Sequence, residues 1–266
     1  MLGYVGPRLP LGRLLVEPVH SLVVQSYRPR EMVSGTVSAD GFGAALWLDD
    51  GEPEPAVYRT ALPVWADPNL GWMSKRIAVR AALAAVRGAT PEVGYELSSV
   101  QPFALGRVAF VHNGFISGFR NGAQRALRRD LGKVAYELLT GGSDSETIFA
   151  VVIDEIERGA PSLGAALRGA VLRVEAVCRE LSTSAVLSAI VGDGDRLVGC
   201  RWSHNAAPAS LYTGTLPLGG PGACLSSEPL DSGETGRSAF DAVPVGSLVE
   251  LRPGERPIVE RIAGSP

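Results

Sequence analysis

Cysteine and histidine are scarce in this sequence of 266 residues, which contains three of each. The cysteines, Cys178, Cys200 and Cys224, are odd in number, far apart and never form a Cys-x-x-Cys pair. We therefore expect neither a disulfide framework nor a cysteine-based zinc site, and a reducing cytoplasmic location fits the sequence better. The histidines also lack the spacing of metal ligands, so we expect no metal and no other cofactor.

Long apolar runs and an excess of one charge are also missing. No stretch approaches the roughly 20 apolar residues that a membrane helix needs. The N-terminal segment has no positive leader and is interrupted by glycine and proline, so we do not interpret it as a signal peptide. The net charge of −3 gives no reason to expect a nucleic acid or an anionic membrane surface as a partner. The sequence is silent on oligomeric state.

Three segments in the middle of the chain have the periodicity of helices. Residues 143–158 open with Ser143-Asp144-Ser145-Glu146, which predicts a capping box in which Ser143 and Glu146 satisfy each other's amide groups. Residues 161–181 carry apolar side chains at three- and four-residue steps. Residues 122–139 also favour a helix, with a weak point at Gly132.

Strands are predicted on both sides of these helices. They are short apolar runs bounded by turn residues, at 2–5, 43–47, 81–86, 107–112, 185–191, 196–202, 223–226 and 247–251. Residues 192–195 join two of them as a hairpin, and residues 213–246 are expected to form loops around one strand. This order favours an α+β architecture over a βαβ repeat. We expect one domain spanning residues 1–266.

Asn113-Gly114 is the first candidate for a functional site. Asn-Gly between apolar runs is a strong signal for a tight hairpin turn, and a turn alone would explain it. The functional interpretation is an oxyanion hole, in which the Asn113 side-chain amide and the Gly114 backbone N–H stabilise a developing negative charge. A tight turn at the end of a strand would be compatible with both.

Arg87, Thr90 and Asp144 could together bind the head group of an α-amino acid. A guanidinium fork binds a carboxylate through two parallel hydrogen bonds, and Thr90 would add a polar contact. Asp144 follows Gly141-Gly142, which would let a ligand approach the backbone, and its carboxylate could receive an ammonium group. The plainer alternatives are an arginine that ends a strand in solvent and an acidic residue that favours a helix dipole.

Taken together, the motifs resemble those of class II glutamine amidotransferases, which are N-terminal-nucleophile enzymes. The resemblance is strongest to the ergothioneine-biosynthesis branch, a γ-glutamyl hydrolase. It spans essentially the whole chain and is carried by residues 2–4, 25–32, 39–43, 62–67, 86–91, 101–103, 112–114, 143–146 and 227–230.

The resemblance implies a four-layer αββα fold with two packed, largely antiparallel sheets. It makes Asn113 and Gly114 the oxyanion hole, and Arg87, Thr90 and Asp144 the residues that hold a glutamyl head group. The implied reaction is hydrolysis of the γ-glutamyl amide of a hercynylcysteine sulfoxide conjugate, with a small-molecule γ-glutamyl compound as the partner.

The beginning of the sequence departs from the family pattern. Members begin Met-Cys-Arg-x-Leu-Gly-Tyr, and the cysteine exposed by removal of methionine is the nucleophile. Here residues 1–4 read Met-Leu-Gly-Tyr, so the cysteine and arginine are absent.

Three explanations follow from this departure. Either the natural start lies three residues upstream, or the protein binds γ-glutamyl compounds without hydrolysing them. A third alternative is a structural or interaction protein whose turns imitate the motifs. In that case Arg87, Asn113 and Asp144 would not lie together near the N-terminus.

Overall fold

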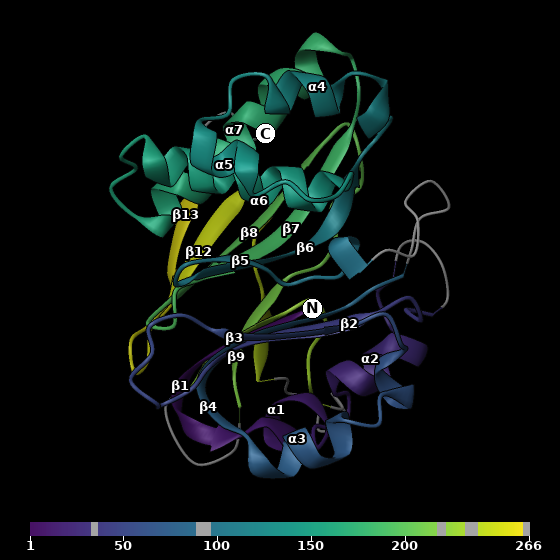
Figure 1. Ribbon diagram of the computed structural model, residues 1–266, viewed down its shortest axis with the longest axis vertical. Coiled ribbons are helices and arrows are strands. Elements are labelled where there is room, and N and C mark those ends of the chain that lie inside the picture. Colours follow the sequence, from purple (N-terminus) through teal and green to yellow (C-terminus); the bar gives the residue numbers. More distant parts are fainter. Residues whose placement is uncertain (33–36, 89–96, 217–221, 232–238, 263–266) are drawn as a thin grey trace.

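Two antiparallel sheets packed face to face form the frame of the protein (Figure 1). The computed structural model describes residues 1–32, 37–88, 97–216, 222–231 and 239–262. Every strand pair in these ranges is antiparallel. Because antiparallel neighbours run in opposite directions, the start of one strand lies beside the end of the next, and this places several motifs at shared edges.

The seven-stranded sheet has the order β11-β9-β10-β1-β4-β2-β3. Its strands are β1 (Leu2–Pro10), β2 (Phe42–Trp47), β3 (Ala56–Thr60), β4 (Ala78–Val86), β9 (Tyr212–Thr215), β10 (Ala223–Ser226) and β11 (Phe240–Ala242). The N-terminal strand β1 lies inside this sheet, between β10 and β4.

The six-stranded sheet has the order β13-β12-β8-β7-β6-β5. Its strands are β5 (Phe103–Leu105), β6 (Val108–Ile116), β7 (Ala185–Gly192), β8 (Leu197–His204), β12 (Ser247–Leu251) and β13 (Ile258–Arg261). The neighbouring strands β6 and β7 pair without interruption from Ala109 to Ile116 of β6.

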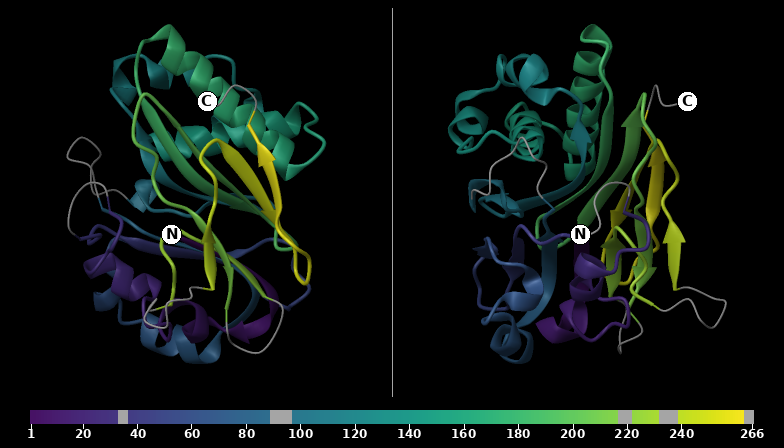
Figure 2. Two further views of the ribbon diagram at one scale, coloured as in Figure 1. Left: turned by 180° about the vertical axis from the view of Figure 1, so that it is seen from behind. Right: turned by 90° about the vertical axis from the view of Figure 1, so that its right-hand side faces the viewer.

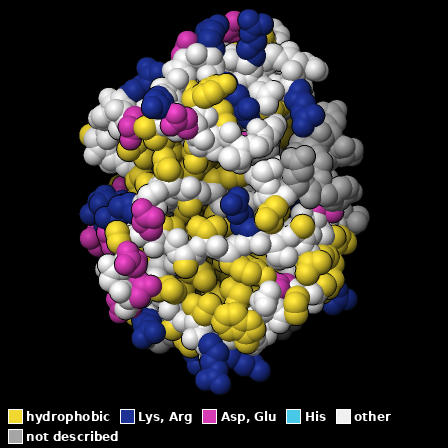
Figure 3. Space-filling model, in the orientation of Figure 1, with side chains coloured by type: hydrophobic (Ala, Val, Ile, Leu, Met, Phe, Trp, Pro, Cys, Tyr) yellow, Lys and Arg dark blue, Asp and Glu magenta, His cyan; other side chains and the backbone are white. Residues whose placement is uncertain are grey.

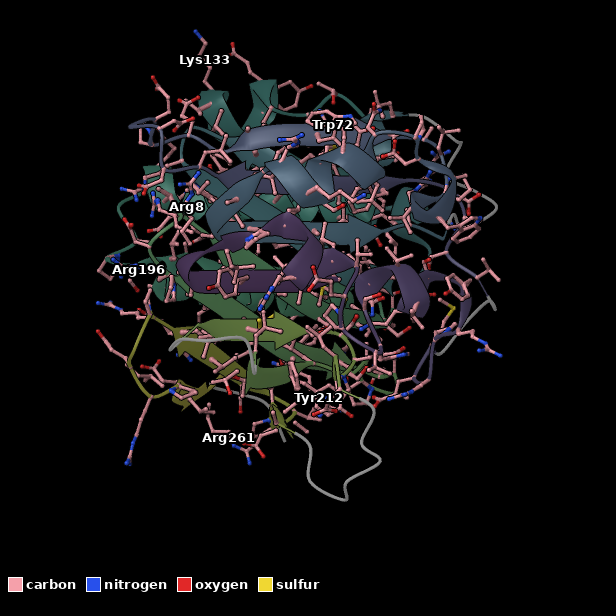
Figure 4. All side chains as sticks on the ribbon, turned by 90° about the horizontal axis from the view of Figure 1, so that it is seen from below. Arg8, Trp72, Lys133, Arg196, Tyr212 and Arg261 are labelled. Carbon is pink, nitrogen blue, oxygen red and sulfur yellow. The ribbon has the colours of Figure 1, made fainter. Side chains whose placement is uncertain are left out.

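Helices cover the outer face of each sheet (Figure 2). The seven-stranded sheet packs against α1 (Leu11–Leu15), α2 (Leu22–Tyr27) and α3 (Leu70–Arg76), and Figure 4 shows this layer with Trp72 on its outer surface. The six-stranded sheet packs against α4 (Ala123–Arg128), α5 (Lys133–Glu137), α6 (Asp144–Glu157) and α7 (Leu163–Glu180). None of the helices in the described part of the chain is long and apolar enough to cross a membrane.

A third apolar layer lies between the two sheets, and apolar side chains gather at this level in Figure 3. Met1 and Val5 of the N-terminal segment face this layer, together with Leu83 of β4 and Ile190 of β7. The alternation of side chains along β1 sends Leu2 and Tyr4 to the opposite, helix-covered face. The α+β class and the four-layer αββα arrangement are therefore confirmed.

The predicted helices are confirmed with two corrections. The Ser143 hydroxyl accepts a hydrogen bond from the Glu146 amide at 3.1 Å, as expected. The Glu146 carboxylate does not accept the expected second hydrogen bond from the Ser143 amide. It instead accepts from the amides of Thr140 and Gly141, at 2.8 and 2.9 Å, because the preceding loop turns over the helix end. Residues 122–139 form two short helices, α4 and α5, and Gly132 is the N-cap of α5.

The expected Asn113-Gly114 turn is wrong. Both residues lie inside β6 and pair with Ser188 and Leu187 of β7. The strand continues to Ile116 because β7 supplies a partner along its whole length. Residues 213–246 were expected to form loops around a single strand at 223–226, but β9 and β11 also fall largely in this range and extend the seven-stranded sheet.

A substitution at Gly3 would test the close packing of the two sheets. A Cβ atom there would lie 3.0 Å from Leu83, 3.1 Å from Leu197 and 3.2 Å from Ile190. Gly3→Val should lower the free energy of unfolding by about 1–3 kcal/mol, the usual effect of overpacking, as measured by urea denaturation. Gly71→Ala is the matched control, since a Cβ atom there meets nothing within 4 Å. Equal stability of Gly3→Val and the wild type would contradict this packing.

Candidate active site

The start of β1, the end of β4 and the start of β2 lie side by side at one end of the seven-stranded sheet. Leu2, near the start of β1, pairs with Ala84 near the end of β4. Val86 at the end of β4 pairs with Phe42 at the start of β2. Arg87 follows directly, and its backbone N–H donates to the Gly41 carbonyl oxygen at 2.9 Å. The N-terminus and Arg87 therefore lie at the same edge.

Met1 is buried in the inter-sheet layer. Its α-amino group donates a hydrogen bond to the Ser227 hydroxyl at 2.8 Å, and the Ser227 amide donates to the Met1 carbonyl oxygen at 3.0 Å. Burial lowers the pKa of this amino group to about 5, although the nearby Glu228 charge acts in the opposite direction. The amino end of the chain is thus held between the two sheets rather than on the surface.

Asn113 and Gly114 lie where β6 emerges from the core, and both are exposed. Gly114 has a φ of +156°, and a Cβ atom at this position would overlap the Val186 carbonyl oxygen. Only glycine therefore fits here, since any side chain would displace the β7 backbone.

Two polar side chains satisfy the backbone amides on either side of Gly114. The Gln101 side-chain oxygen accepts from the His112 N–H at 2.5 Å, and the Asp144 carboxylate accepts from the Ile116 N–H at 3.0 Å. Alternate amides of a strand point to the same side, so the Gly114 N–H points with these two, away from β7. It lies between Gln101 and Asp144, beyond Phe110, the last residue of β6 that pairs with β5.

Asp144 begins helix α6 and is half-buried beside the end of β6. One carboxylate oxygen accepts from Ile116, and the other accepts from the Ser145 N–H at 2.7 Å. Within the described residues Asp144 forms no ion pair. Its charge is therefore balanced by backbone amides, and lone pairs remain for a cationic ligand.

Gln101 joins the two sheets at this end of the molecule. Its side chain also donates to the His112 carbonyl oxygen at 2.9 Å, so it binds both backbone groups of that residue. Its own backbone oxygen lies against Gly43, where a Cβ atom would overlap it. Since Gly43 pairs with Ala85, Gln101 brings the edge that carries Arg87 next to the strand that carries Asn113.

A chain of buried serines makes a second connection between the sheets. Ser188, the partner of Asn113, donates to the Ser210 carbonyl oxygen at 2.9 Å. The Ser210 hydroxyl donates to the Ser227 carbonyl oxygen at 2.7 Å, and Ser227 binds Met1. These contacts bring Met1, Arg87, Asn113, Gly114 and Asp144 to one end of the two-sheet structure. Thr90 lies outside the described residues.

The three cysteines are buried, as expected for structural thiols. Burial raises the pKa of Cys178 to about 11 and that of Cys200 to about 12, and it raises the pKa of Cys224 as well. A thiol with a raised pKa is a poor nucleophile because it carries little thiolate. Across the described ranges, no group of three or more histidine, cysteine, aspartate or glutamate side chains could hold a metal ion.

Sequence reasoning missed a buried pair beside the N-terminus, formed by His20 and Glu228. The Glu228 carboxylate lies 2.6 Å from His20 Nε2 and accepts from the amides of Arg30 and Glu31 at 2.9 and 3.1 Å. Burial alone would raise the pKa of Glu228, but these hydrogen bonds hold it below its ordinary value. The partners are about 200 residues apart, so no local pattern could indicate the contact.

Two packed antiparallel sheets, outer helices and an amino end held between the sheets define the fold of N-terminal-nucleophile hydrolases. No protein-family model matches the chain. The γ-glutamyl-hercynylcysteine sulfoxide hydrolase of Mycolicibacterium smegmatis is 29% identical over 250 residues, which cover 94% of this chain and 93% of the relative. The protein of the same name from Mycobacterium tuberculosis is 28% identical, covering 94% and 91%.

A solved structure agrees with these relatives. The glutamine aminotransferase class-II domain protein of Silicibacter pomeroyi superposes with a TM-score of 0.70 at 24% identity, covering 98% of both chains. This structural similarity shows a shared fold. The two hydrolases are similar to the chain in amino-acid sequence. The chain is therefore similar in sequence to named γ-glutamyl hydrolases and in fold to a class II glutamine amidotransferase-type protein, and both similarities support an amidohydrolase enzyme.

Glu228 should make the stability of the protein depend on pH. Its pKa is lowered in the folded state, so its contribution is present above the ordinary value of 4.5 and is lost as the pH falls through the folded-state pKa. Glu228→Gln should lower the free energy of unfolding by about 1–3 kcal/mol at pH 7 and reduce its loss below pH 4.5. Urea denaturation between pH 3 and 7 measures both effects.

The control is Glu17→Gln, which removes an exposed carboxylate 3.6 Å from Arg13 and should leave the pH profile unchanged. If Glu228→Gln kept the full acid dependence of the wild type, the assignment to Glu228 would be wrong.

Proposed function

We propose that this protein hydrolyses a γ-glutamyl amide and releases glutamate, with γ-glutamyl-hercynylcysteine sulfoxide as its substrate. The observation that carries the proposal is the Gly114 amide, which lies between two amides already satisfied by Gln101 and Asp144. A backbone N–H held in this way beside an exposed asparagine is suited to receive an oxyanion. The substrate follows from the named relatives, which match the chain over nearly its whole length.

In this proposal, Arg87 and Asp144 hold the two charged groups of the glutamyl head. The guanidinium of Arg87 binds the α-carboxylate, and Thr90 adds a polar contact. Asp144 binds the α-ammonium through the lone pairs that Ile116 and Ser145 leave open. The γ-carbonyl then extends from Asp144 toward the neighbouring Gly114, where Asn113 and Gly114 stabilise the tetrahedral intermediate.

The nucleophile in this proposal is a cysteine ahead of Met1. No cysteine precedes Cys178 in the sequence, and the thiols at 178, 200 and 224 are buried. If the β1–β4 register continued backwards, the second residue ahead of Met1 would lie opposite Arg87 and face the same side as Met1. At about 3.4 Å per residue, it would extend about 7 Å beyond Met1, toward the edge where Arg87 lies.

Restoring the nucleophile tests the proposed activity directly. A chain extended by Met-Cys-Arg should release glutamate from a γ-glutamyl thioether conjugate once its initiator methionine is removed, because the cysteine thiol and its own α-amine act as a unit. The chain that begins at Met1 should release none above background. In the extended chain, Asn113→Ala should slow turnover about a hundredfold or more by removing one oxyanion donor.

The control is the same extension with serine in place of cysteine. Glutamate release by the chain that begins at Met1 would mean that the nucleophile is elsewhere. An inactive but correctly processed extended chain would indicate instead a protein that binds γ-glutamyl compounds without hydrolysing them.

Binding can be tested without catalysis. The chain that begins at Met1 should bind L-glutamine, since Arg87 and Asp144 do not need the nucleophile. Arg87→Lys replaces a planar fork with a point charge and should weaken binding about tenfold, as measured by calorimetry. Arg76→Lys, in the last turn of helix α3, is the control and should bind like the wild type. Equal affinity of Arg87→Lys and the wild type would remove Arg87 from the site.

A further inference from the structure

His112 is a buried histidine whose two ring nitrogens have different partners. Nε2 lies 3.1 Å from the Val186 carbonyl oxygen, and Nδ1 lies 2.9 Å from the Ser145 hydroxyl. A carbonyl oxygen can only accept, so Nε2 carries the proton. Burial lowers the pKa of His112, against the opposing charge of Asp144, so the ring is neutral at pH 7. Nδ1 is then an acceptor, and the Ser145 hydroxyl donates to it.

The same hydroxyl also lies within reach of Asp144. Ser145 Oγ is 3.2 Å from the carboxylate oxygen Oδ1, which already accepts from the Ser145 N–H at 2.7 Å. A hydroxyl has one proton, so it cannot donate to His112 and to Asp144 at once. While it donates to neutral His112, the carboxylate has two backbone donors and keeps its other lone pairs open.

We propose that His112, acting through the Ser145 hydroxyl, is a positioning residue that controls how firmly Asp144 binds a substrate ammonium. When the ring gains a proton, Nδ1 becomes a donor to Ser145, and the hydroxyl turns its own proton to Asp144. The carboxylate then has a third donor and a cation nearby, and both weaken its hold on an ammonium group. This inference rests on the role proposed above for Asp144.

The groups that surround the His112 ring show how its protonation can reach Asp144. Asp144, at the start of helix α6, is the charged group whose field acts on the ring. Strand β7 contributes the uncharged Val186 carbonyl, and β6 contributes the Phe110 ring, stacked at 6.4 Å. Gln101 binds only the His112 backbone. The Ser145 hydroxyl is therefore the link through which the ring and the carboxylate exchange hydrogen bonds.

The test is L-glutamine binding by the chain that begins at Met1, measured by calorimetry from pH 7 down into the range in which the His112 ring gains its second proton. The α-carboxylate and the α-ammonium of glutamine both stay largely charged between pH 7 and about pH 4, so a change in affinity over that range comes from the protein. Because the pKa of His112 lies below its ordinary value of 6.5, affinity should fall on the acid side of that value, by about three- to tenfold. Ser145→Ala should lose most of this dependence, whereas Ser145→Thr keeps the hydroxyl and should retain it.

A nitrogen NMR spectrum of the His112 ring gives a second measurement that needs no variant. It should show the proton on Nε2 at pH 7, and a proton on Nδ1 would overturn the proposal. Unchanged affinity across the pH range in which this spectrum shows the ring gaining its second proton would also overturn it, as would a full pH dependence in Ser145→Ala. If neither the wild type nor Ser145→Thr binds glutamine at any pH, the proposed function itself fails, which is distinct from binding that does not depend on pH.

Discussion

The contact between the inner faces of the two sheets determines where every candidate site residue lies. Small side chains, such as Gly3 and Ala85 on one sheet and Ala109 on the other, allow the sheets to pack closely. Because β1, β2 and β4 are antiparallel neighbours, the start of β1 and the end of β4 share an edge. The packing of the two sheets places these strand ends near Asn113 and Gly114, the exposed residues of β6. The candidate site therefore lies where both sheets end.

The hydrogen-bond requirements of β6 shape the site itself. Beyond Phe110 the strand loses β5, so its outward amides need other partners. Gln101 supplies one and Asp144 supplies another, which fixes both side chains and leaves the Gly114 amide between them. The groups that complete the strand are thus the ones that border the proposed oxyanion hole, and stability and function depend on the same contacts.

Much of the fold was predictable because its signals are local. Strands β10 and β12 have the predicted bounds, and α7 follows its apolar stripe within two residues at each end. Strands β3 and β13 were missed because they are edge strands with largely exposed side chains, and so lack the alternation of a half-buried strand.

The candidate site could be predicted only in part. Arg87, Asn113 and Asp144 were identified from motifs, and the structure brings them to one end of the molecule. The Asn113-Gly114 turn was wrong because pairing with β7 overrides the local turn signal. The bonds from Gln101 to His112 and from His112 to Ser145 join residues 11 and 33 positions apart, and such contacts leave no local pattern in the sequence.

The most direct test of the account is a crystal structure of the chain with L-glutamine bound. The account predicts the α-carboxylate at Arg87, the α-ammonium at Asp144, and the side-chain carbonyl oxygen within hydrogen-bond distance of the Asn113 amide and the Gly114 N–H. Glutamine bound elsewhere, or bound with its carbonyl oxygen turned away from Gly114, would contradict it.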